Sequence, residues 1–192
     1  MKKKSIASAV ALGLLLSAGG ANADFISGSI SFSDGFENVA TAGATSIVSE
    51  LTAFDVDNPP GVNSPNGDFT GTSAATAFDF DINALPSLFF TTDTGFEFVL
   101  TGAVLNSASP LACSGGLCTD DIVLNVSGVV SGDSPFEDTG FLGTFSANGS
   151  CLGGDSVCTA DASASWSASL TATGTAAQVP EPSTTAVLGL GL

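Results

Sequence analysis

The sequence predicts an all-β fold, an antiparallel β-sandwich or jelly roll that forms a single domain. Three observations support this prediction. Apolar and polar residues alternate with a period of two in several segments, glycine- and proline-rich turns separate these segments, and no amphipathic helical pattern occurs beyond residue 23. Antiparallel sheets with one polar face bury the other, so we expect the 14 Phe to fill the space between two layers.

The first 23 residues have the pattern of a secretory signal peptide. Three consecutive Lys at positions 2–4 precede an apolar run over residues 6–16, and Ala21 and Ala23 form a small-residue cleavage site. The run is too short to span a membrane, and the alternative is a buried N-terminal helix. We expect export through a Sec-type signal, cleavage after Ala23, and a location at the cell surface or outside the cell.

The charge of the exported chain excludes whole classes of partner. Residues 24–192 contain all 19 Asp and Glu but no Lys, Arg or His, so their formal charge is −19. Nothing in this chain could neutralise phosphates, which excludes a nucleic-acid partner. An anionic membrane surface would repel the chain for the same reason.

Six predicted strands follow one another within a domain that we place at residues 24–174. Each has one apolar face and one face of Ser, Thr, Asn or acid. They cover residues 25–33, 76–83, 95–102, 121–128, 140–149 and 161–174. In the last of them Trp166 lies on the apolar face, which favours core packing over stacking on a sugar.

Turn signals divide the strands. They are Asp34-Gly35, the proline-rich stretch 57–68, Ser-Gly-Asp-Ser-Pro at 131–135, and Asn148-Gly149. The alternation ends near Gly174, and residues 175–192 form an extended linker and a tail, because proline disfavours helix at the residue before it.

The four cysteines predict two disulfide bonds, as is usual for an even number in an exported chain. Three pairings are formally open. We expect Cys113–Cys118 and Cys151–Cys158, because each pair lies across a short loop that contains glycine. A four-cysteine zinc site is the alternative, but its usual C-x2-4-C spacing does not occur here.

The end of the chain resembles a known sorting signal. Residues 179–183 read Val-Pro-Glu-Pro-Ser, and an apolar run at 186–192 follows. Together with the N-terminal leader, this resembles the PEP-CTERM family, whose signal is a Pro-Glu-Pro motif, a transmembrane helix and a terminal cluster of Arg. The resemblance implies that Pro180, Glu181 and Pro182 are read by an exosortase, a membrane cysteine protease-transpeptidase of Gram-negative bacteria that export polysaccharide.

The tail departs from the family pattern in length. Seven residues of helix span about 10 Å, whereas the hydrocarbon core of a membrane is about 30 Å thick, and no Arg follows. We therefore expect a truncated signal, only transient membrane contact, and release to the outside. The alternative is a C-terminus without function.

Catalytic side chains are scarce in the exported part. Without His or Lys there is no base for a serine nucleophile, and paired cysteines are not nucleophiles. Carboxylate pairs such as Asp120 and Asp121, or Asp79 and Asp81, could in principle hydrolyse glycosides. We expect a protein that is not an enzyme, and a polysaccharide hydrolase is the less favoured alternative.

The acidic loop is a candidate cation site, with Asp55, Asp57 and Asp68 as carboxylate ligands. Ca²⁺ takes six to eight oxygen ligands, which such loops can supply, although the spacing is not that of an EF-hand. An ordinary solvated turn is the simpler interpretation. The sequence thus predicts an exported, non-catalytic protein of the surface or the polysaccharide matrix, with a glycan- or Ca²⁺-binding sandwich as the alternative.

Overall fold

The computed structural model describes residues 24–36, 48–56, 59–154 and 157–174, and the side chains of residues 153–163 lie outside this description. Within these ranges the only helical elements are two short 3-10 turns, η1 (Val48–Glu50) and η2 (Gly67–Phe69). The strands are β1 (Asp24–Phe25), β2 (Ser27–Phe36), β3 (Ala53–Phe54), β4 (Gly61–Asn63), β5 (Ala75–Ala77), β6 (Phe80–Asp81), β7 (Ser87–Thr92), β8 (Glu97–Ser114), β9 (Leu117–Ser131), β10 (Phe136–Glu137), β11 (Thr139–Gly154) and β12 (Val157–Thr173). The predicted all-β class is confirmed.

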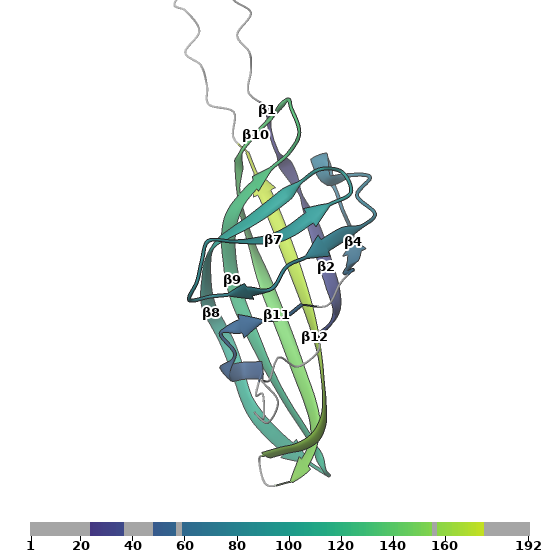
Figure 1. Ribbon diagram of the computed structural model, residues 1–192, viewed down its shortest axis with the longest axis vertical. Helices are drawn as coiled ribbons and strands as arrows, with labels where there is room; N and C mark the ends of the chain where they lie inside the picture. The colour runs from purple at the N-terminus through teal and green to yellow at the C-terminus, as the bar shows by residue number, and fades with distance from the viewer. Residues whose placement is uncertain (1–23, 37–47, 57–58, 155–156, 175–192) are drawn as a thin grey trace, which may run out of the picture.

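One antiparallel sheet of eight strands makes up most of the molecule, in the order β4-β2-β12-β11-β9-β8-β7-β5. β8, β9, β11 and β12 run along its length, and β7 crosses in front of them (Figure 1). In a flat sheet β2 and β7 would lie about 24 Å apart, since neighbouring strands are spaced about 4.8 Å. Yet Phe32 in β2 and Phe90 in β7 stack with ring centroids 4.2 Å apart.

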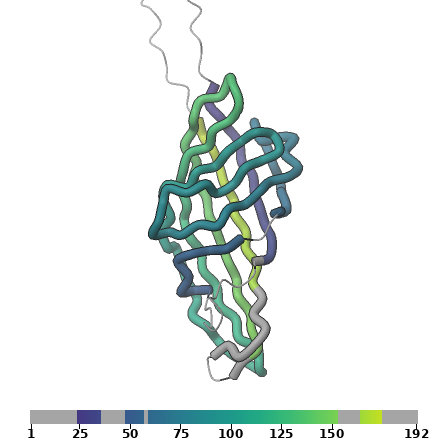
Figure 2. The backbone as a smooth tube through the Cα atoms, in the orientation of Figure 1, coloured from purple at the N-terminus to yellow at the C-terminus, as the bar shows by residue number. Residues whose placement is uncertain are grey.

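The sheet is therefore bent so far that its two ends face each other as the two layers of a sandwich. The backbone trace in Figure 2 shows the segment of β7 lying across the long strands. Two small sheets complete the fold, β3 with β6 and a parallel pair of β1 with β10. The predicted antiparallel sandwich is thus built from a single bent sheet.

Phenylalanine rings fill the space between the layers, as predicted. Phe98 has ring centroids at 6.2 Å from Phe32, 5.5 Å from Phe69 and 5.6 Å from Phe141. Removing a ring of this size from water contributes about 1.5–3 kcal/mol, and a close aromatic pair adds about 0.5–1.5 kcal/mol. The largest fully buried aromatic side chains are Phe32, Phe54, Phe69, Phe89, Phe90, Phe98, Phe141 and Phe145.

Small residues on β12 leave room for these rings. On its inward face Ala168 lies between Trp166 and Leu170, and all three are buried. Trp166 packs against Phe90 and Phe145, with ring centroids 5.7 and 5.9 Å away. Trp166 is therefore a core residue, as its position on the apolar face predicts. Its indole N–H is buried and makes no hydrogen bond with any described residue.

Two of the predicted turns are wrong. Asp34-Gly35 lies inside β2, where Gly35 pairs with Ser165 of β12. Asn148-Gly149 lies inside β11, with β9 on one side and β12 on the other. Glycine at 149 provides space rather than a turn, because a Cβ atom there would lie 2.5 Å from Oδ1 of Asp120. Of the other two signals, the described residues 59–68 contain only one strand, the three-residue β4, and residues 132–135 lie between β9 and β10.

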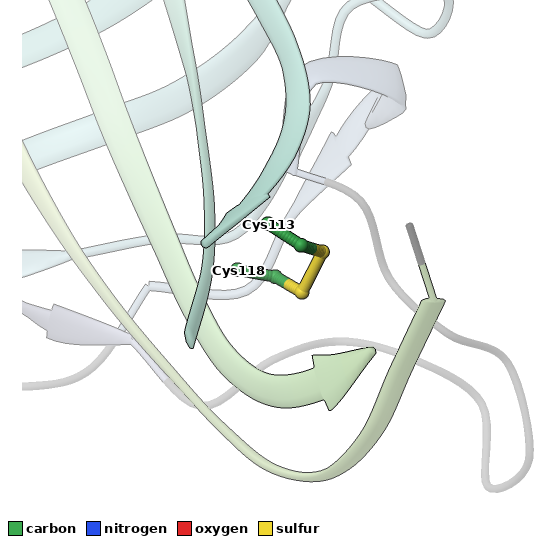
Figure 3. The surroundings of a disulfide bond; sticks show 2 residues. All are labelled: Cys113 and Cys118. Carbon is green, nitrogen blue, oxygen red and sulfur yellow. A yellow bond between two sulfur atoms is a disulfide. The ribbon is translucent and has the colours of Figure 1, made fainter. Parts of the chain in front are cut away.

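The Cys113–Cys118 disulfide closes the end of the β8–β9 hairpin (Figure 3). The turn consists of Gly115 and Gly116, with φ of 62° and 87°. Two-residue hairpin turns of type I′ need positive φ at both positions, which glycine adopts without strain. This predicted pairing is confirmed, and it rules out the zinc site with four cysteines.

The second predicted disulfide is described in part. Cys151 is disulfide-bonded and lies beside Cys118 in the β9–β11 ladder. The side chain of Cys158 is outside the described part, so the pairing Cys151–Cys158 stays a prediction.

Candidate functional site

The face of the long strands that points away from the core carries an ordered array of polar side chains. We call it the outer face. Side chains alternate between the two faces of a strand, so the residues between the inward Phe and Ala positions point to the outer face. Its members include Ser29, Ser31 and Ser33 on β2, Ser165, Ser167, Ser169 and Thr171 on β12, Thr144, Ser146 and Asn148 on β11, and Thr119, Asp121, Asn125 and Ser127 on β9.

Over part of the outer face these side chains bond to one another. Neighbouring strands bring the hydroxyls and amides of paired positions together. The contacts are Ser146 with Ser167 (2.8 Å between oxygens), Ser31 with Ser169 (3.3 Å), Asn63 Nδ2 to Ser33 Oγ (3.0 Å) and Asn66 Nδ2 to Ser29 Oγ (2.7 Å). These polar groups are satisfied internally.

A hollow of about 510 Å³ lies on the outer face toward the hairpin ends. The ladders place Ser109, Asp121, Asn148 and Ser165 in one row across β8, β9, β11 and β12. A register shift in β8 between Ser109 and Ala112 falls beside this row. The polar side chains on the outer face that line the hollow are those of Ser109, Thr119, Asp121, Asn148, Ser150 and Ser165.

The row in the hollow differs in its hydrogen bonding from the paired part of the outer face, and it shares this property with Asn125, Thr144 and Thr171, whose side chains also have no hydrogen bond in the described chain. Asp121 is half-buried, whereas Asn148 and Ser165 are exposed. Among the described residues, none of these three side chains has a hydrogen-bond partner. The hollow therefore presents a carboxylate, an amide and hydroxyls that are held by a rigid sheet and open to a ligand.

Asp120 and Asp121, a candidate catalytic pair, point to opposite faces of β9. Asp120 is 6% exposed on the inward face, where its Oδ2 accepts a 2.7 Å hydrogen bond from the backbone N–H of Ser49 in η1. The two carboxylates of a glycosidase must flank one bond. Both residues border the hollow, but the Asp120 carboxylate is bound to η1 on the inward face whereas that of Asp121 lies on the outer face, so this pair does not meet that requirement.

The second carboxylate pair also has a structural role. Asp79 Oδ1 accepts a hydrogen bond from the backbone N–H of Val56 at 3.0 Å, and Asp81 Oδ1 accepts one from that of Asn83 at 2.8 Å. Both residues line a smaller hollow of about 310 Å³, together with Asp55. These bonds hold the loops around the short β3–β6 sheet.

The predicted cation ligands are only partly within the described chain. Asp68 Oδ2 accepts a 2.7 Å hydrogen bond from the backbone N–H of Ser27, and Asp55 lines the smaller hollow near β6. Asp57 lies outside the described residues. In the parts that are described, no group of three or more Asp, Glu, His or Cys could hold a metal ion. The set of Asp55, Asp57 and Asp68 stays a prediction.

The residues that specify export lie outside the described ranges. They are Ala21 and Ala23 at the leader and Pro180, Glu181 and Pro182 at the tail. Among the described residues, no helix is long and apolar enough to cross a membrane. Searches with the chain against protein-family models, curated proteins and solved structures find no match.

Sequence reasoning missed most of the hollow because it ended the predicted strand 140–149 in a turn at Asn148-Gly149. A signal was present, however. From 145 to 151 the sequence Phe-Ser-Ala-Asn-Gly-Ser-Cys keeps small or apolar residues at odd positions and polar ones at even positions. Continuing the strand beyond Gly149 instead of turning there would have kept Asn148 on the outer face. Ser109 gave no comparable signal, since its position depends on the irregular register of β8.

Proposed function

We propose that this chain is an exported, non-catalytic protein of the cell surface or of an extracellular polysaccharide matrix. Its destination follows from the leader at residues 1–23 and the PEP-CTERM-like residues 180–182. The processing partner is an exosortase-type enzyme, and membrane contact is transient and limited to the tail. No cofactor is needed for this role, although Ca²⁺ is the ion that the acidic loop would suit.

The observation that carries the proposal is the outer face. Five neighbouring strands present hydroxyl, amide and carboxylate groups, with no cationic side chain beyond residue 23. Hydroxyls and amides form hydrogen bonds with the hydroxyls of a hydrated polysaccharide as readily as with water. The absence of His and Lys in residues 24–192 leaves a serine nucleophile without its usual base, which supports a role without catalysis.

Cell fractionation tests this proposal. The exported chain should begin at Asp24 and be found with the matrix or in the medium. Replacing Pro180, Glu181 and Pro182 with Ala should change its distribution or its C-terminal processing, whereas Gln178→Ala in the same linker should not. A chain that keeps Met1 and stays in the cytoplasm would contradict the proposal.

The second candidate function is a glycan-binding module, favoured by the unpaired polar row in the hollow. A related candidate is a module that binds Ca²⁺ instead of a glycan. If Ca²⁺ binds the folded chain, millimolar CaCl₂ should raise the melting temperature more than NaCl of matched ionic strength, since a ligand of the folded state stabilises it by mass action. Equal melting temperatures would remove Ca²⁺ from the account.

A further inference from the structure

The hollow has the size and chemistry of a ligand site. Its volume of about 510 Å³ falls within the roughly 300–1,000 Å³ of small-molecule sites. Ser109, Asp121, Asn148 and Ser165 cross it in one row on four adjacent strands, so they are spaced regularly at about 4.8 Å. The sheet holds their backbones in place, so binding would cost little conformational entropy of the backbone.

The unpaired state of this row separates it from the next row along β11 and β12. Only two positions further along β11 and β12, Ser146 and Ser167 bond to each other at 2.8 Å. In the described chain no comparable bond engages Asp121 or Asn148, and Asp121 is half-buried. A partly desolvated carboxylate is stabilised by donated hydrogen bonds. The hydroxyls of a sugar can donate to Asp121 and both donate to and accept from Asn148.

Charge decides the class of sugar. The exported chain carries a formal charge of −19 and has no cationic side chain. An acidic polysaccharide would be repelled by the whole chain and would find nothing to pair its carboxylates or sulfates. A neutral sugar meets neither obstacle, and its hydroxyls can both donate hydrogen bonds to this row and accept them from it.

We propose that the hollow between β8, β9, β11 and β12 binds a neutral glycan, with Asp121 and Asn148 as its principal hydrogen-bonding residues. This deepens the proposed function and rests on it for the source of the glycan. Binding by the purified chain is nevertheless a property of the hollow alone. A chain that binds neutral polysaccharide but is not exported would contradict only the proposed function.

Native affinity electrophoresis of residues 24–192 tests the proposal. The chain should be retarded in gels that contain neutral polysaccharide, with dextran, galactomannan and xyloglucan as the probes, and not in gels that contain alginate. Asp121→Ala and Asn148→Ala should each weaken retardation by about tenfold, the effect of one lost hydrogen bond to a charged or amide group. Both side chains point away from the core, so the melting temperature checks that the variants remain folded.

Two variants serve as matched controls. Asn125→Ala removes an amide that is also exposed on the outer face but lies outside the hollow, and Glu97→Gln removes an equal charge from β8. Both should be retarded like the parent chain. No retardation by any of the three neutral polymers would overturn the proposal. It would also be overturned if alginate retarded the chain equally, or if Asp121→Ala and Asn148→Ala behaved like the controls.

Discussion

The two faces of β11 and β12 have opposite chemistry, although their residues alternate one by one along the same two strands. Phe145 and Trp166 point inward and are at most 2% exposed. The residue that follows each of them, Ser146 and Ser167, points outward, and these two serines bond to each other. The inward face contributes apolar burial, which drives folding. The outward face buries little, so its composition is free to serve recognition.

The comparison also holds within the outer face. Where Ser31, Ser33, Ser146, Ser167 and Ser169 lie, polar groups satisfy one another. In the hollow, the side chains of Asp121, Asn148 and Ser165 have no such partner among the described residues. A surface whose hydrogen bonds are internally satisfied has less to gain from a ligand than one whose groups are open. Open groups that also border a hollow indicate where on this largely polar face a ligand would bind.

The largest expected effect belongs to the inward face. Phe98→Ala should lower the free energy of unfolding by about 3–5 kcal/mol, because it removes a ring that contacts three others and leaves a cavity. The neighbouring variant Glu97→Ala, at an exposed outward position, should change it by no more than about 0.5 kcal/mol. Urea unfolding of both variants measures the contrast, and equal losses would contradict it.

Glycine at 149 tests how closely the inward face is packed. An added Cβ atom would lie 2.5 Å from Asp120 Oδ1 and 2.6 Å from a methyl carbon of Val48. Gly149→Ala should therefore destabilise the chain by up to about 3 kcal/mol. Gly140→Ala, in the same strand, has its nearest atom at 4.0 Å and serves as the control. If the two variants melt at the same temperature, Asp120 is not held as described.

The disulfide at the hairpin end should contribute about 2 kcal/mol through loop closure. The double variant Cys113→Ser with Cys118→Ser should melt about 4–8 °C lower than the parent chain, given the size of the domain. Differential scanning calorimetry without reductant makes the measurement. An unchanged melting temperature would mean that the β8–β9 hairpin is fully ordered by its own ladder.

Asp93 should give the smallest effect. Hydrogen bonds from the hydroxyl and then the backbone N–H of Ser73 hold the pKa of the Asp93 carboxyl below its usual value. A lowered pKa in the folded state stabilises the chain above the ordinary pKa of Asp, and this stabilisation is lost as the pH falls through the folded value. Asp93→Asn should thus be slightly less stable than the parent at pH 7, with the gap closing in acid.

Thermal melts from pH 7 to pH 2 measure the difference in stability between Asp93→Asn and the parent chain. Asp138→Asn is the control, since this exposed carboxylate makes no hydrogen bond within the described chain. A gap for Asp93→Asn that stays constant with pH would contradict the assigned role of Ser73.

The sequence pattern was sufficient for most of the strands and the core because alternation reports burial directly. It was wrong for residues 76–83, which are divided between β5 and β6 in two different sheets. Residues 161–174 lie almost wholly within β12, and most of the predicted Phe positions are buried, although Phe78 is only half-buried. The local turn signals at Asp34-Gly35 and Asn148-Gly149 failed because glycine is found in turns and also inside strands, where a neighbouring group must approach the backbone closely. No local pattern reports that Asp120 fills the space above Gly149, since the two are 29 positions apart.

The bend of the sheet and the hollow were also beyond sequence reasoning. The stacking of Phe32 on Phe90 depends on how far a sheet of eight strands curls, which alternation does not encode. The row from Ser109 to Ser165 depends on register, and β8 has three irregularities along its ladder with β9. One residue of slip would move Ser109 to the other face.

An alanine scan along residues 141–148 of β11 tests the division between the faces most directly. Thermal melts should show Phe141→Ala and Phe145→Ala at least about 6 °C below the parent chain. Leu142→Ala, Thr144→Ala, Ser146→Ala and Asn148→Ala should melt close to it, even though Leu142 is a large apolar residue, because that side chain is 70% exposed. Melting temperatures that fall at Leu142 or Asn148 as far as at Phe145 would contradict the account, since the outer face would then be part of a second core.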